Sequence, residues 1–251
     1  MAGRALIGCS GWSYRDWRGT FYDAKLTTKG WFSSYARHFW TVEVNNTFYR
    51  MPPETTFRAW REQAPAAFVY ALKVNRFGTH RLKLGQPERW VDLHAQRARL
   101  LGPALGPNLV QLPPNWRRDL GRLEAFLARA TEVSGEGAPL RWTIEFRDPS
   151  WLADATFELL SRYQVALCCH DLLPEHPWEL TAPWGYARFH GPDALARKYV
   201  GDYGEAALQR PARMLAEWLA AGCDVFAYFN NDTAGAAPRD AERLERLLKS
   251  G

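Results

Sequence analysis

Cysteine and long apolar runs are scarce in this sequence. Four cysteines occur among 251 residues, and Cys9, Cys168, Cys169 and Cys223 lack the paired spacing that holds a metal ion. Most of them fall within apolar, strand-like runs, so we expect buried free thiols. No uninterrupted apolar run approaches the roughly 18 residues that suggest a membrane span. We therefore expect a cytoplasmic protein with no membrane partner.

The rest of the composition is typical of a basic globular protein. Hydrophobic residues make up 47% of the chain and charged residues 24%, while tryptophan occurs 12 times, well above common usage. Some of these indoles are expected to line a site. A net charge of +5 and a pI near 9.1 favour anionic partners such as phosphates, nucleic acid or acidic metabolites. Solubility explains the same charge equally well.

Short β-rich runs alternate with helix-like segments along the chain. The expected strands are ALIGCS, TVEVNN, FVYALKVN, NLVQLP, RWTIEFR, VALCCHD, GYARFHG and DVFAYFNND. The expected helices are Trp31–His38, Glu54–Gln63, Glu88–Leu101, Leu120–Thr131, Ser150–Arg162, Gly204–Ala221 and Asp240–Lys249. The connection from Leu172 to Pro183, between the sixth and seventh strands, lacks a helix-like segment.

This alternation predicts the α/β class and a single (β/α)8 barrel, because strand–helix–strand units form parallel crossovers. An open doubly wound sheet is the alternative. Two stretches rich in glycine and proline, Leu101–Asn108 and Ser134–Pro139, separate no complete strand–helix sets and are expected as loops. We therefore predict one domain over residues 1–251.

Polar side chains recur in one phase of the expected strands. Alternate residues of a strand face the same way, so in a barrel one phase points inward. The inward polar residues near the strand ends are Ser10, Glu43, Asn45, Lys73, Asn75, Gln111, Glu145, Arg147, His170, Arg188, His190 and Asn230. Active sites of such barrels lie at the carboxyl ends of the strands. We therefore predict a polar pocket there, with TFYR, which contains Tyr49, as a loop that walls it.

The same charges allow a purely structural interpretation. Glu43, Lys73, Glu145 and Arg188 provide two acids and two bases that could neutralise one another inside the barrel. A buried ion network adds little stability over apolar packing of similar volume. We therefore favour a functional pocket.

With these strand ends in view, the chain resembles the domain of unknown function 72 family, the YecE-like TIM barrels. The resemblance rests on IGCSGWSYRDWRGTFY, YARHFWTVEVNNTFYRMP, ALKVNRFGTH, LVQLPPNW, EFRDPSW and YFNND, which together span nearly the whole chain. It implies a TIM barrel and no settled reaction. It also implies that the family's polar positions fall on Ser10, Trp12, Glu43, Asn45, Lys73, Gln111, Glu145, Arg147, Asn230 and Asp232.

A metal site is the minority interpretation of these residues. Barrels that hydrolyse phosphodiesters with clustered divalent ions need several histidines and carboxylates. The candidates here are His170, His190, Glu43, Glu145, Asp171 and Asp232. Lys73 and Arg188 would repel cations from the same floor. We therefore expect no cofactor, with a divalent metal as the alternative.

Glycoside hydrolysis by Glu43 and Glu145 is a second alternative. Aromatic walls for a sugar would come from Trp12, Tyr14, Trp17, Phe48, Tyr49 and Trp151. Many retaining glycosidases of this fold place their carboxylates on strands four and seven. Those strands end here in Gln111 and His190, so the pattern is absent.

Basic residues interleaved with aromatics favour an anionic ligand. They are Arg15, Arg18, Lys25, Arg50, Lys73, Arg76, His80, Arg81, Lys83, Arg147, Arg188 and Lys198. We predict a hydrolase or lyase that acts on a phosphate-bearing ligand or nucleic acid, with Glu43, Glu145 and Lys73 as catalytic residues. The other inward residues named above are predicted to bind the ligand, together with Trp12, Tyr49 and Asp232. The rival hypothesis is a non-catalytic barrel that binds nucleic acid through its basic rim. The oligomeric state is left open.

Overall fold

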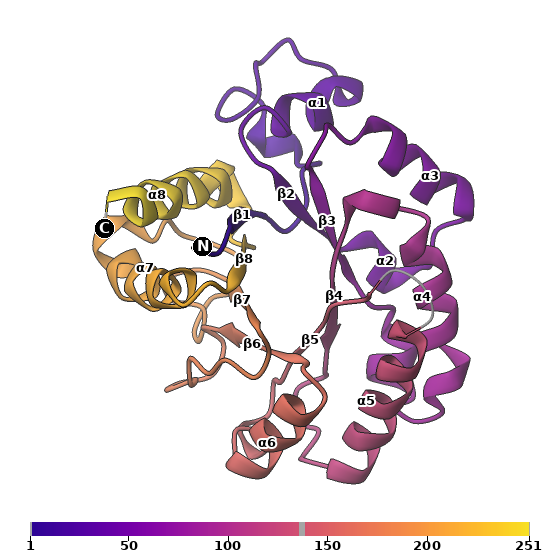
Figure 1. Cartoon of the computed structure of the whole chain (residues 1–251). Coiled ribbons are helices and arrows are strands. Elements are labelled where there is room, and N and C mark those ends of the chain that lie inside the picture. Colours follow the sequence, from indigo (N-terminus) through magenta and orange to yellow (C-terminus); the bar gives the residue numbers. More distant parts are fainter. Residues whose placement is uncertain (1, 136–138, 251) are drawn as a thin grey trace. The chain divides into compact units, whose positions relative to one another are not determined.

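Strands and helices alternate through the computed structural model, which describes residues 2–135 and 139–250 (Figure 1). The strands are β1 (Ala5–Cys9), β2 (Thr41–Val44), β3 (Val69–Lys73), β4 (Leu105–Gln111), β5 (Trp142–Glu145), β6 (Ala166–His170), β7 (Trp184–Phe189) and β8 (Asp224–Phe229). The helices are α1 (Trp31–Tyr35), α2 (Asn46–Tyr49), α3 (Glu54–Gln63), α4 (Val91–Arg99), α5 (Leu120–Ser134), α6 (Asp154–Arg162), α7 (Gly204–Ala220) and α8 (Ala236–Ser250). The predicted α/β class of a (β/α)8 barrel is confirmed.

The strands follow one another in the sheet order β1-β8-β7-β6-β5-β4-β3-β2. Neighbouring strands pair in parallel, as in β1 with β8 and β4 with β5. The chain divides into two compact units. Unit 1 comprises Met1–Glu43, Cys169–Trp178 and Pro183–Gly251, and unit 2 comprises Val44–Cys168 and Glu179–Ala182. The prediction of one domain over the whole chain stays a prediction.

The start of β4 corrects the expected loop Leu101–Asn108, because the strand begins at Leu105. Tyr70 pairs with Leu105 and Leu72 with Asn108, so β4 has one residue more than β3 over this interval. Such a bulge accommodates Pro107, which has no N–H group to donate to a neighbouring strand. The other expected loop, Ser134–Pro139, lies partly outside the described residues.

The segment after β2 also differs from the prediction. Asn45 has helical dihedral angles (φ −96°, ψ −20°) and precedes α2, so it does not continue the alternation of the strand. The expected loop TFYR is therefore largely helical. The Thr47 hydroxyl donates a hydrogen bond of 2.6 Å to the Lys73 carbonyl oxygen, which ties α2 to the end of β3.

Other boundaries move by a few residues. Helix α8 begins at Ala236, earlier than Asp240, because Pro238 lies in its first turn, where proline needs no hydrogen-bond partner. Helix α6 begins at Asp154, after a short 3-10 turn at Pro149–Trp151. Between β6 and β7, the described residues 171–183 form turns, bends and irregular backbone.

Aromatic side chains form much of the core of unit 1. Trp17, Trp31 and Tyr35 are at most 2% exposed. The rings of Tyr22 and Trp31 stack with centroids 5.3 Å apart, and Trp17 donates its indole N–H to the Asp232 carbonyl oxygen at 2.7 Å. Trp17 is therefore a core residue, and it does not form the open sugar wall that the glycosidase alternative requires.

Apolar side chains of unit 2 pack between its strands and α4 to α6. Trp90, which precedes α4, stacks on Phe126 of α5 with centroids 5.4 Å apart. Ile144 of β5 and Trp151 are fully buried in the same cluster. Trp151 is thus also unavailable as an open sugar wall. This packing sets the positions from which the ends of β3, β4 and β5 present their polar residues.

Gly8 allows a close approach between β1 and β2 in unit 1. A Cβ atom there would lie 2.3 Å from the Thr41 carbonyl oxygen and 2.8 Å from the Tyr35 hydroxyl. Backbone atoms cannot move aside as a flexible side chain does. We predict that Gly8→Ala lowers the free energy of unfolding by about 1–3 kcal/mol, measured by urea denaturation.

Gly121 provides the matched control for this prediction. It lies in α5, and the nearest atom to a Cβ there is 3.7 Å away. Alanine in a helix is about 0.5–1 kcal/mol more favourable than glycine, so Gly121→Ala should stabilise. Equal effects of the two substitutions would contradict a steric origin.

Candidate functional site

A buried ion pair joins the ends of β2 and β7 in unit 1. Glu43 and Arg188 have side chains that are 0% exposed, and Arg188 Nη2 donates to Glu43 Oε1 at 2.7 Å. The Ser10 hydroxyl donates to Glu43 Oε1 at 2.6 Å, and the Tyr186 hydroxyl donates to Oε2 at 2.7 Å. The carboxylate is surrounded by hydrogen-bond donors, which is the condition for burying a charge.

A second chain of hydrogen bonds leads from Arg188 to Asp171. Arg188 Nη1 lies 3.1 Å from His190 Nε2, and a guanidinium can only donate, so Nε2 accepts. His190 Nδ1 lies 2.8 Å from Asp171 Oδ1 and carries the ring proton. Asp171 also accepts from the His190 backbone N–H at 2.8 Å and from the Tyr203 hydroxyl. His190 is therefore held as one neutral tautomer.

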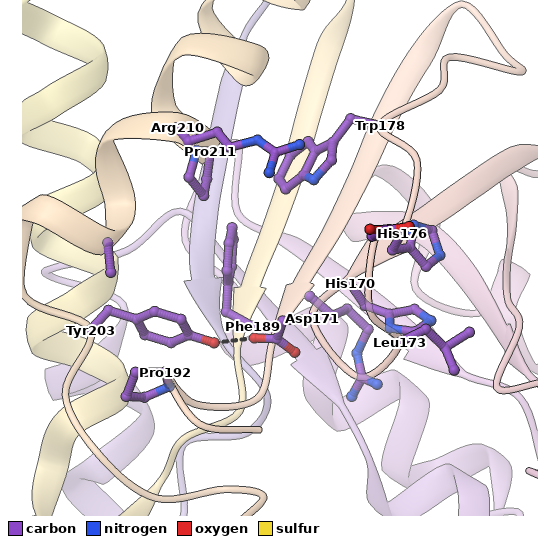
Figure 2. Close-up of a pocket in the computed structure, with 13 residues that line it drawn as sticks. His170, Asp171, Leu173, His176, Trp178, Phe189, Pro192, Tyr203, Arg210 and Pro211 are labelled. Atoms are coloured by element: carbon purple, nitrogen blue, oxygen red, sulfur yellow. Dashed lines mark hydrogen bonds between the residues drawn. The ribbon is translucent and has the colours of Figure 1, made fainter. Parts of the chain in front are cut away.

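This network borders a cavity of about 300 Å³ in unit 1. Figure 2 shows the bond between Tyr203 and Asp171 near one end of the cavity and Trp178 with Arg210 near the other. His170, at the end of β6, is another wall residue, and its Nδ1 accepts from the Leu172 N–H at 3.1 Å. The walls mix acidic, basic and apolar side chains, so they indicate no particular ligand charge.

Asp232 is the unusual carboxylate of unit 1. Burial raises the pKa of Asp232 to about 7, against the lowering effects of the nearby Tyr14 hydroxyl and Arg188 charge. Its Oδ1 atom is buried and has no hydrogen-bond partner among the described residues. A carboxyl group with such a pKa can exchange protons near neutral pH.

In unit 2, Glu145 ends β5 and forms an ion pair with Arg147. The Glu145 side chain is 0% exposed and that of Arg147 is 10% exposed. The Cys168 thiol also lies 3.8 Å from Glu145 Oε2. Gln111 pairs in register with Glu145, but its side-chain amide donates to the Leu112 carbonyl oxygen at 2.7 Å.

Positive charge gathers around Phe48 in the same unit. Lys73 Nζ lies 4.4 Å from the centroid of the Phe48 ring, and Arg76 Cζ lies 5.9 Å from it. The His80 ring packs edge-on against Phe48 at 5.0 Å. Burial, followed by the charges of Lys73, Arg76 and Arg147, lowers the pKa of His80 to about 4. His80 is therefore neutral at physiological pH.

A basic cavity of about 470 Å³ opens beside this cluster. Its wall residues are Tyr49, Asn75, Arg76, Phe77, His80 and Arg81. The last five of these lie at the end of β3 and in the single π-helical turn Phe77–Arg81 that follows it. Asn75 starts this turn, because its Oδ1 accepts from the Phe77 N–H at 2.9 Å and its Nδ2 donates to the Thr47 carbonyl oxygen at 2.9 Å.

Most of the predicted site residues do lie at strand ends, and they are distributed over both units. Unit 1 contains Ser10, Trp12, Glu43, His170, Arg188, His190, Asn230 and Asp232, and unit 2 contains Asn45, Tyr49, Lys73, Asn75, Gln111, Glu145 and Arg147. Direct contacts join Ser10 to Glu43, Glu43 to Arg188, and Glu145 to Arg147. Glu43 and Glu145 belong to different units, so their pairing stays a prediction.

Several residues of these groups were not predicted as site residues. Tyr186 is two residues before Arg188 in β7, so the alternation of side chains along a strand predicts that both face the same way, and both contact Glu43. Tyr203 is 32 residues from Asp171 in the sequence, so no local pattern predicts the hydrogen bond between them. Among the described residues, no three His, Cys, Asp or Glu side chains cluster as metal ligands.

Comparison with known proteins decides the family. The model described as "Protein of unknown function DUF72" matches residues 6–251. The chain belongs to the DUF72 family. This confirms the resemblance that the sequence motifs indicated.

This DUF72 protein has relatives in Bacillus subtilis and Escherichia coli. It is 25% identical to the UPF0759 protein YunF of Bacillus subtilis, over 96% of this chain and 94% of the relative. It is 32% identical to the UPF0759 protein YecE of Escherichia coli, over 59% of this chain and 50% of that relative.

Solved structures of the same family share the fold. The crystal structure of a DUF72 family protein from Thermotoga maritima has a TM-score of 0.85 and 25% identity, covering 98% of this chain and 99% of that one. One from Enterococcus faecalis has a TM-score of 0.80 and 19% identity, covering 98% and 95%. Neither name states an activity. No helix in the described part of the chain has the length and apolarity to cross a membrane.

The first prediction from this DUF72 site concerns the buried pair. Glu43→Gln leaves Arg188 buried without its counter-charge, so we expect a loss of about 3–5 kcal/mol in the free energy of unfolding. The double variant Glu43→Gln/Arg188→Met should recover much of it. Exposed Glu54, which pairs with Arg97, is the control, and Glu54→Gln should cost under about 1 kcal/mol. A small loss in Glu43→Gln would contradict the dependence of Arg188 on this carboxylate.

The second prediction concerns Asp232. The carboxyl group of Asp232 has a pKa of 3.8 in the unfolded chain and about 7 in the folded one. Between these two pH values the unfolded chain loses the carboxyl proton while the folded chain keeps it, so stability falls as the pH rises. Asp232→Asn removes that loss. The stability gained by the variant should grow from near zero below pH 4 to a few kcal/mol, about 4 at most, above pH 7. Urea denaturation between about pH 4 and pH 7 measures the difference in free energy of unfolding, and Asp193→Asn, at an exposed aspartate, is the control. A gain that does not change with pH would contradict the raised pKa.

Proposed function

We propose that this protein binds a phosphate-bearing anion in the basic cavity after β3 and is an enzyme of the hydrolase or lyase type that acts on it. The observation that carries the proposal is the surplus of positive charge at this cavity. Arg76 and Arg81 line it, and Lys73 and Arg147 lie close enough to act on His80, which also lines it. Glu145 is the one carboxylate among the main electrostatic influences on His80.

Arginine suits the proposed ligand because its planar guanidinium donates paired hydrogen bonds to phosphate oxygens. Arg76 and Arg81 are solvent-exposed and border an open volume, so a ligand can reach them. His80 adds a group whose pKa should rise when an anion binds beside it. π-Helical turns are frequent at functional sites, and here the turn brings His80 and Arg81 to the same wall.

Glu145 is the candidate general acid or base for the catalytic part of the proposal. Its carboxylate is paired with Arg147. A phosphate group that attracts Arg147 would weaken this pair and leave Glu145 able to transfer a proton. Lys73 would stabilise negative charge on the same ligand. The proposal involves no cofactor.

Nucleic-acid binding is the second candidate function, and the Tyr49 ring favours it. Tyr49 is 71% exposed and borders the basic cavity, so a base could stack on it while a phosphate binds the arginines. The glycosidase alternative has less support, because Ser10, Tyr186 and Arg188 already occupy the oxygens of Glu43. A fully hydrogen-bonded carboxylate is a poor proton donor.

Titration with inorganic phosphate tests the anion site. Phosphate binding should raise the pKa of His80 from about 4 toward its ordinary 6.5, because the anion offsets the neighbouring cations. NMR of the His80 ring with and without phosphate measures this pKa. Arg81→Ala should weaken phosphate binding about 10-fold, and Glu145→Gln should strengthen it by freeing Arg147.

Arg117→Ala is the matched control, because Arg117 is an exposed arginine of unit 2 outside the cavity. It should leave phosphate affinity unchanged. A His80 pKa that does not respond to phosphate would overturn the site. Short single-stranded DNA at several salt concentrations separates the second candidate, since binding through several phosphates weakens steeply with salt.

A further inference from the structure

A second cavity of about 360 Å³ adjoins the basic one in unit 2. The two share Tyr49, Asn75 and Phe77 as wall residues. The remaining walls are mostly apolar and consist of Met51, Val74, Trp90 and Leu93, with Arg50, Arg89 and His94. Its volume lies within the range of about 300–1,000 Å³ that is typical of small-molecule sites.

Phe77 lines both cavities and lies close to an arginine from each. Arg81 Cζ, from the basic cavity, lies 5.9 Å from the Phe77 ring centroid, and Arg89 Cζ, from the apolar cavity, lies 5.6 Å from it. Gly78 fixes this arrangement, because a Cβ there would lie 2.2 Å from the ring of Trp90. The turn is thus packed directly on a wall of the apolar cavity.

His94 gives the apolar cavity one defined polar group. Asn108 Nδ2 donates to the Arg141 carbonyl oxygen at 3.1 Å, so Asn108 Oδ1 is the atom that faces His94 Nε2 at 2.7 Å. His94 Nε2 therefore carries the proton and Nδ1 is an acceptor. His94 is 1% exposed, and its Nδ1 has no hydrogen-bond partner among the described residues. A buried acceptor left unpaired favours a ligand that offers an N–H group.

We propose that the ligand of the basic cavity is a nucleoside monophosphate, with its phosphate on Arg76 and Arg81 and its base in the adjoining apolar cavity. This inference rests on the proposed function and extends it. A nucleobase is planar and aromatic, so it suits a cavity whose walls include the aromatic side chains Phe77 and Trp90, and its amino or ring N–H group matches the acceptor of His94. A hydrocarbon group would leave that acceptor unpaired.

Calorimetric titration of the full chain with adenosine 5′-monophosphate and with ribose 5-phosphate tests the inference. The nucleotide should bind about 10-fold or more tighter than ribose 5-phosphate, because only the nucleotide fills the apolar cavity. Leu93→Trp should abolish this preference, since Leu93 is 41% exposed and a larger side chain there occupies the cavity without disturbing the core. Leu195→Trp, at an exposed leucine of unit 1, is the matched control and should retain the preference.

The ¹⁵N resonance of His94 Nδ1 gives a second readout that needs no variant. It should shift when the nucleotide binds and stay unchanged with ribose 5-phosphate, because only the base reaches His94. Equal binding of the nucleotide and ribose 5-phosphate would overturn this inference and leave the phosphate site intact. A nucleotide preference that survives in Leu93→Trp would also overturn it, since the base would then bind elsewhere. Failure of every phosphate compound to bind would overturn the proposed function itself.

Discussion

The contact between Gly78 and Trp90 is the constraint on which the two adjoining cavities of unit 2 depend. A side chain at residue 78 would overlap the indole, so the turn after β3 can pack against α4 and α5 only with glycine there. That packing sets where Phe77 and Arg81 project, and thus where a basic cavity meets an apolar one. One small residue therefore couples the hydrophobic core of unit 2 to its polar surface.

Each unit contains a buried ion pair, Glu43–Arg188 in unit 1 and Glu145–Arg147 in unit 2, but unit 2 also presents exposed arginines at an open cavity. In unit 1, Glu43 and Arg188 are wholly buried and neutralise each other, with hydroxyl donors completing the carboxylate's partners. Such a pair keeps its geometry because breaking it leaves an uncompensated ion. In unit 2, three cations and one carboxylate act on His80, and Arg76 and Arg81 line the open basic cavity beside it. A matched pair suits a fixed framework, whereas unmatched charge at an open surface suits the capture of an anion.

The fold was largely predictable from the sequence, and the site only in part. The alternation of side chains along a strand predicted the polar ends of β5 and β7, because this alternation depends only on residues that are close in the sequence. The start of β4 was missed because a bulge hides Pro107 within a strand. The lowered pKa of His80 and the cavity lined by Met51, Trp90 and Leu93 could not be predicted, since they arise from residues that only tertiary packing brings together.

The buried thiols have a consequence for how the chain responds to oxidants. Cys9 and Cys168 are both 0% exposed and neither forms a disulfide bond among the described residues; Cys9 lies in unit 1 and Cys168 in unit 2. Burial also raises the pKa of Cys9 well above its usual range, so its reactive thiolate form is suppressed. Modification of either sulfur requires its surroundings to open. Each thiol therefore serves as an internal marker for the unfolding of its own unit, and the order in which they react would reveal whether the units open together.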